Sequence, residues 1–194
     1  MKRAALALAG LALAASLAGC GGTKTVTVTT TRTVTVTRTV TGPTTPPANA
    51  APCTGGDLHG TFTALAGSAG AGHIVYTLTL TNAGSAACWV SGLPVVQLLD
   101  GSGNGLPTQV IAGRPGVATA AKVTLVPGAA AGAQARFSPD VQGVGDSTTG
   151  PCQPTASTLR VTPNGGGTLD VAISPPTSVC EQGQLQFDVL AAVS

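Results

Sequence analysis

The chain is poor in charged and aromatic residues. Of its 194 residues, 8% are charged and 3% are aromatic, whereas globular proteins usually carry about 25% charged residues. A net charge of only +2 excludes the strongly basic surface on which nucleic-acid binding depends. The hydrophobic fraction of 43% and the low charge also exclude a chain kept unfolded by charge repulsion. We therefore expect a folded protein without a nucleic-acid partner.

Histidine is also scarce, which limits the chemistry available. Only His59 and His73 are present, and no G-x-S-x-G motif occurs, although a serine or cysteine nucleophile needs an adjacent base. The two histidines could meet across a sheet, with Asp57, as a metal site, but solvated histidines at strand ends are the simpler interpretation. Asp100 begins a segment similar to a calcium loop, yet Ile111 stands where the bidentate Glu is required. We expect no enzyme activity, no cofactor and no metal.

No apolar run is long enough to cross a membrane. The longest, residues 4–17, follows Lys2 and Arg3 and falls short of the roughly 20 residues that a membrane span needs. It is typical of a secretory signal peptide. Its LAGC ending at Cys20 resembles the lipobox of bacterial lipoproteins, which implies cleavage before Cys20 and a lipid on that thiol. The alternative is an ordinary signal peptide with an incidental cysteine.

These features predict the order of segments. We expect residues 1–19 to be a lipoprotein signal peptide and Cys20, modified with palmitate-type acyl chains, to hold the protein on the extracytoplasmic face of the cell membrane. Residues 20–52 form a stalk with thirteen Thr and no aromatic residue. Because a lone polar strand has nothing to bury and the Pro-rich end cannot pair, we predict an extended, disordered stalk. Its three basic residues could contact anionic lipid or only interrupt a Thr/Val aggregation stretch, and O-glycosylation of its Thr residues stays open.

Residues 53–194 show the short alternating apolar runs of an all-β domain. The clearest is residues 73–81, in which Ile74, Tyr76, Leu78 and Leu80 form the expected core face. Turn residues are expected at 82–84, 100–101, 127–128 and 164–167. Further strands are predicted over residues 60–64, 89–90 continuing into 95–99, 109–111, 122–126, 133–137, 158–162, 169–173 and 184–190. This number of strands favours an immunoglobulin-like antiparallel β-sandwich over a barrel.

Four cysteines remain once Cys20 is assigned to the lipid. They are an even set in an exported chain and allow three pairings. We favour Cys53 with Cys88 and Cys152 with Cys180, because each pair brackets a compact block of strands. Trp89, beside Cys88, is expected to pack in the core near a disulfide.

Four segments carry a family resemblance. They are AGAGHIVYTLTLTNAGSAACWVSGLPVVQLLDGSG, KVTLVPGAAAGAQARF, CQPTASTLRVTP and VCEQGQLQFDV, in which L-T-N-x-G, a cysteine, G-x-P and D-G follow in order. Over residues 53–192 the chain resembles the actinobacterial secreted and lipoprotein family catalogued as domain of unknown function 4232. The resemblance implies a disulfide-containing β-sandwich in the cell envelope, and it implies no activity and no site residues.

The expected function is a binding or structural role without catalysis. The partner would be an envelope protein or a cell-wall component, and the alternative is a lipoprotein that binds a small molecule or a metal. Residues 138–151 form an irregular segment longer than a connection needs, and such loops are often functional or variable. Contact with a partner and plain variability are both open for this loop.

Overall fold

The computed structural model describes residues 24–30, 34–40, 49–114 and 121–193. The predicted signal peptide and Cys20 lie outside these residues. The chain divides into two compact units, residues 1–44 and residues 45–194. No helix in the described part of the chain is long and apolar enough to span a membrane.

The stalk contains a two-stranded antiparallel ladder. Strands β1 (Lys24–Thr30) and β2 (Val34–Val40) pair over seven positions, from Lys24 with Val40 to Thr30 with Val34. The prediction of a disordered stalk is therefore wrong for these residues. The Thr/Val alternation occurs on both sides of residues 31–33, so each half finds a partner strand of high β propensity within the same segment.

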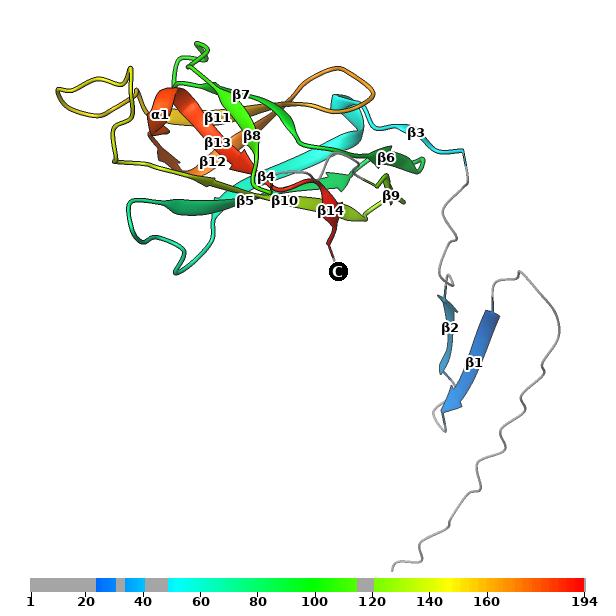
Figure 1. The fold of residues 1–194 in the computed structure, drawn as a ribbon. Coiled ribbons are helices and arrows are strands. Elements are labelled where there is room, and N and C mark those ends of the chain that lie inside the picture. Colours follow the sequence, from blue (N-terminus) through cyan, green and yellow to red (C-terminus); the bar gives the residue numbers. More distant parts are fainter. Residues whose placement is uncertain (1–23, 31–33, 41–48, 115–120, 194) are drawn as a thin grey trace, which may run out of the picture. The chain divides into compact units, whose positions relative to one another are not determined.

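The regular secondary structure of the second unit is almost all strand (Figure 1). Its two helical turns are the 3-10 helix η1 (Gly55–Asp57) and the short α1 (Cys180–Gly183). Its strands are β3 (Ala51–Pro52), β4 (Leu58–Ala64), β5 (Ile74–Asn82), β6 (Cys88–Val90), β7 (Val95–Leu99), β8 (Gln109–Ala112), β9 (Val123–Leu125), β10 (Ala130–Phe137), β11 (Ala156–Thr162), β12 (Leu169–Thr177), β13 (Gln184–Phe187) and β14 (Ala191–Ala192).

These strands form a β-sandwich. A nine-stranded sheet runs in the order β7-β11-β12-β4-β5-β10-β13-β8, with β14 added to β10, and a three-stranded sheet runs β3-β6-β9. The large sheet folds over itself at β4, which pairs along its length with β5 but with β12 only at Phe62 and Thr63. Buried side chains from both halves then form one hydrophobic core. Every strand that the sequence predicts has a counterpart here, and the all-β fold class is confirmed.

The pairing directions differ from the predicted antiparallel sandwich. Three pairs, β12 with β4, β13 with β8 and β3 with β6, are parallel. The predicted last strand, residues 184–190, is also shorter, because β13 ends at Phe187 between β10 and β8, and the separate β14 beyond it pairs with β10. Parallel partners require a long crossover connection, and local alternation carries no signal for strands so far apart in the chain.

Aromatic rings gather at the centre of the core. Tyr76 lies 5.1 Å from Phe62 and 5.2 Å from Phe137 between ring centroids, and Phe187 lies 6.2 Å from Phe62. The Tyr76 hydroxyl donates a 2.8 Å hydrogen bond to the carbonyl of Pro175, and burial raises the pKa of this phenol. Tyr76 belongs to the predicted core face of β5, of which Leu78 and Leu80 are also buried and Ile74 is partly buried against the core.

One of the predicted turns has a different role. Asn82 is 1% exposed, and its side-chain amide donates to the carbonyls of Ala86 and Leu125 at 2.8 Å each. It therefore anchors the loop after β5 to β9 instead of supplying a positive φ. The turn at Gly128, with φ of +83°, is confirmed.

Candidate functional site

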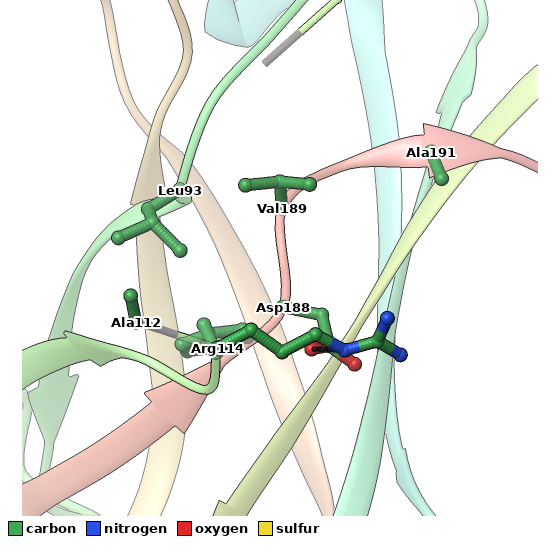
Figure 2. Close-up of a pocket in the computed structure, with 7 residues that line it drawn as sticks. Leu93, Ala112, Arg114, Asp188, Val189 and Ala191 are labelled. Carbon is green, nitrogen blue, oxygen red and sulfur yellow. Dashed lines mark ion pairs between the residues drawn. The ribbon is translucent and has the colours of Figure 1, made fainter. Parts of the chain in front are cut away.

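A pocket of about 260 Å³ opens beside the end of β8 (Figure 2). Its walls are mostly apolar, and one cation and one anion lie among them. Leu93 and Val189 lie opposite the Arg114 side chain in the close-up. The lining residues are Leu93, Ala112, Arg114, Phe187, Asp188, Val189 and Ala191. Such a combination of apolar walls with a few polar groups is typical of small-molecule sites.

The parallel pairing of β8 with β13 builds this pocket. Ala112 is in register with Phe187, and the Gly113 amide donates a 2.8 Å hydrogen bond to the Phe187 carbonyl. Arg114 and Asp188 follow these two strand ends directly, which brings them together. On the opposite wall, the Leu190 amide donates to the Gly92 carbonyl at 2.9 Å and holds the segment containing Leu93 in place.

The charges at the pocket are exposed and only loosely paired. The Nε atom of Arg114 lies 3.9 Å from Oδ1 of Asp188, and the two side chains are 80% and 42% exposed. A hydrogen bond between such groups spans about 2.7–3.2 Å, so this is an electrostatic pair only. The sequence carries no signal for it, because Arg114 and Asp188 are joined by strand order and not by spacing.

The two histidines do not form the metal arrangement that the sequence offered as the alternative to solvated strand-end residues. His59 lies on β4 in register with Thr81, whereas His73 precedes β5 at the opposite end of the same ladder. The Nδ1 atom of His73 lies 2.9 Å from the Ala71 carbonyl oxygen. The carboxylate of Asp57 accepts hydrogen bonds from Thr54 instead. The two histidines therefore share no site with each other or with Asp57.

The segment that begins at Asp100 is a self-contained turn. One carboxylate oxygen of Asp100 accepts the backbone N–H groups of Ser102 and Asn104 at 2.8 and 2.9 Å. These bonds lower the pKa of Asp100, with the Asn104 side chain contributing most. The turn reading of this segment is confirmed.

Trp89 is half-buried and lies outside the hydrophobic core. Its strand neighbours Cys88 and Val90 are buried, and the alternation of a strand directs Trp89 to the other face. There the Lys122 ammonium lies 4.2 Å from the ring centroid, a cation–π contact. The expectation of a core tryptophan beside the disulfide is therefore wrong.

Both disulfides follow the pairing that the sequence favours. Cys53 is bonded to Cys88, and Cys152 is bonded to Cys180. The second bond lies beside Asp146, and these three residues are the one cluster of potential metal ligands in the part of the chain that the structure describes. Sulfurs joined to each other are not thiolate ligands, so the cluster is structural.

Asp146 is the most heavily hydrogen-bonded carboxylate in the described domain. It is only 9% exposed, and it lies within the irregular loop of residues 138–151. Its carboxylate accepts hydrogen bonds from the backbone N–H groups of Gly143 (2.8 Å), Glu181 (2.6 Å) and Gln182 (2.9 Å) and from the side-chain amide of Gln153 (2.9 Å). The loop is thereby tied to the turn before β13.

The Asp146 carboxylate stabilises an unusual backbone turn. Glu181, Gln182 and Gly183 have consecutive φ values of +55°, +56° and +75°, a conformation that costs a non-glycine residue roughly 1–2 kcal/mol. This turn directs successive N–H groups at one carboxylate. Desolvation alone would raise the pKa of Asp146, but the hydrogen bonds from Gln153 and the three backbone amides outweigh it and hold the pKa well below its usual range. Sequence reasoning noted only the length of this loop.

Asp146→Asn is expected to lower the midpoint of thermal unfolding at pH 7 by about 5–10 °C, because an amide nitrogen would face hydrogen-bond donors. The pKa of Asp146 is lower in the folded state, so its contribution is complete above about pH 4 and is lost as the pH falls below that. The difference between wild type and variant should therefore shrink between pH 4 and pH 2. Calorimetry over this range measures it. Asp140→Asn, an exposed change in the same loop, is the control, and equal midpoints for the two variants would contradict the assignment.

Comparison with known proteins identifies a family. The model of the family described as Domain of unknown function (DUF4232) matches residues 53–191. No curated protein and no solved structure matches the chain. The match covers the disulfide-bonded sandwich from Cys53 to the first residue of β14, including the pocket and Asp146. The chain therefore belongs to the family of domains of unknown function 4232.

Proposed function

We propose that this protein is a lipid-anchored extracytoplasmic module that binds a ligand without transforming it. The observation that carries the binding role is the pocket beside β8, which combines apolar walls with Arg114 and Asp188. None of the residues that line it is a serine, cysteine or histidine, so the pocket lacks the Ser–His or Cys–His pair of a common nucleophilic site. The envelope protein or cell-wall component stays a prediction for the partner.

Two features support a place outside the cytoplasm. The LAGC sequence at Cys20 follows a short apolar segment of the signal-peptide type. The two disulfides of the domain suit an oxidising compartment. A diacylglyceryl group contributes about 0.8 kcal/mol per buried CH₂, and two acyl chains suffice for stable anchoring. The membrane is therefore the partner proposed for Cys20.

Wild-type protein produced in a bacterial host with radiolabelled palmitate should carry the label and sediment with the membranes. Cys20→Ser removes the thiol that receives the lipid, so the label should be lost and the protein should move to the soluble extracytoplasmic fraction. Both quantities are measured by autoradiography and fractionation. Cys53→Ser, which changes a disulfide cysteine, is the control and should keep the label. Persistent labelling of Cys20→Ser would reject the anchor.

A further inference from the structure

Arg114 and Asp188 have unused capacity to bind a ligand. At 3.9 Å their atoms are too far apart to share a hydrogen bond. Among the described residues, neither the guanidinium of Arg114 nor the carboxylate of Asp188 makes a hydrogen bond to another group. Figure 2 shows the terminal nitrogens of Arg114 pointing away from Asp188. The guanidinium can therefore hold an anion while the Asp188 carboxylate holds a cation.

The apolar part of the pocket sets the size of the ligand. Leu93, Val189 and Ala112 line the space next to the two charges. The pocket volume of about 260 Å³ is close to the lower end, roughly 300 Å³, of the volumes of small-molecule sites. A pocket of this size suits a small ligand, such as one amino acid with a branched aliphatic side chain.

The charges decide the class of ligand. An anion would be attracted by Arg114 but repelled by Asp188. A cation would be attracted by Asp188 but repelled by Arg114. A zwitterion satisfies both groups and leaves the site neutral. Charge-assisted hydrogen bonds of this kind are shorter and roughly twice as strong as neutral ones.

We propose that this pocket binds a free α-amino acid with an apolar side chain. Its ammonium group donates to Asp188, its carboxylate accepts from Arg114, and its side chain packs against Leu93 and Val189. The proposal rests on the proposed binding function and names the ligand class for that same site.

The test is a titration of the full chain with L-leucine, followed by methyl NMR of Leu93 and Val189. The protein is held in phospholipid nanodiscs, or in buffer if Cys20 carries no lipid. We expect saturation with a Kd of about 0.1–1 mM. N-acetyl-L-leucine lacks the ammonium, L-leucinamide lacks the carboxylate and glycine lacks the side chain, so each should bind at least about tenfold more weakly.

Two variants assign the contacts. Arg114→Gln and Asp188→Asn should each weaken leucine binding at least about tenfold, and both side chains are exposed enough for the fold to remain. Arg136→Gln changes an exposed arginine on β10 and should leave the Kd unchanged. Equal binding of leucinamide and leucine, or an unchanged Kd in Arg114→Gln, would overturn the amino-acid assignment.

The outcomes also separate this proposal from the binding function on which it rests. If leucine does not saturate the site but uncharged fragments shift the methyl signals of Leu93 and Val189, the ligand class is wrong and the binding role stands. If neither leucine nor the fragments shift these methyl signals while Cys20 carries its lipid, the pocket is not a binding site. The binding role and the amino-acid ligand proposed for this pocket are then both rejected.

Discussion

Gly183→Ala is expected to lower the free energy of unfolding by about 3–5 kcal/mol. Gly183 has a φ of +75°, which an alanine adopts only at a cost. A Cβ at this position would also overlap the carbonyl oxygen of Pro107 and lie 2.5 Å from its carbonyl carbon. Because this neighbour is backbone, relief requires the segment before β8 to move. The addition of a single methyl group is therefore expected to have a large effect on the free energy of unfolding.

The same movement of the segment before β8 would distort the candidate site. Pro107 precedes β8 and Gly183 precedes β13, and these two strands form the parallel pair that carries Ala112 and Phe187. Gly183→Ala should therefore weaken ligand binding at the pocket as well as stability, although residue 183 is not part of the pocket wall.

Gly166→Ala separates the cost of a positive φ from the cost of steric overlap at the added Cβ. Gly166 has a similar φ of +81°, but nothing lies within 4 Å of the position of its Cβ, so we expect a loss of only about 1–2 kcal/mol. Urea unfolding followed by the fluorescence of Trp89, the single tryptophan, measures both variants. Equal losses for Gly183→Ala and Gly166→Ala would contradict the close approach of β13 to the segment before β8.

Phe62→Ala is expected to cost about 3–5 kcal/mol of unfolding free energy. Phe62 is 1% exposed and contacts the rings of Tyr76 and Phe187. It lies on β4 at the point where β12 also pairs, in register with Ile173. A cavity here removes packing from both halves of the sandwich.

Two further variants calibrate this result. Phe62→Leu keeps most of the volume and should cost about 1–2 kcal/mol. Val144→Ala shortens a fully exposed valine and should change stability by less than about 0.5 kcal/mol. Chemical unfolding at pH 7 gives all three values. A loss for Phe62→Ala that matches the loss for Val144→Ala would show that the aromatic cluster does not hold the two halves together.

The irregular loop of residues 138–151 illustrates the limit of a sequence reading. Its length marks it as unusual, but its acidic residue Asp146 looks like any other surface carboxylate in the sequence. The fold surrounds it with hydrogen-bond donors from its own loop, from Gln153 and from the turn at Glu181 and Gln182. The donors of that turn come from a segment about 35 positions later in the chain, and no local pattern announces them.

For the stalk and for Trp89, the prediction from local sequence is wrong because it leaves out the neighbouring strand or residues. A lone Thr/Val strand has nothing to bury, but two copies of the Thr/Val pattern pair with each other as β1 and β2. Trp89 was assigned to the core from its hydrophobic ring and its place beside Cys88. On a short strand with two buried neighbours, it faces outward and is covered by Lys122.

The sequence by itself determined the all-β class, the core face of β5 and the family, and it favoured the pairing of the four domain cysteines that the structure contains. Each of these depends on alternation between residues two positions apart, on turn residues, or on the blocks of strands between cysteines. Only the tertiary structure decided which strands are neighbours. The place of the pocket follows from that strand order. Arg114 and Asp188 meet because β8 and β13 pair in parallel, and that pairing results from the packing of the whole chain, which no local period in the sequence encodes.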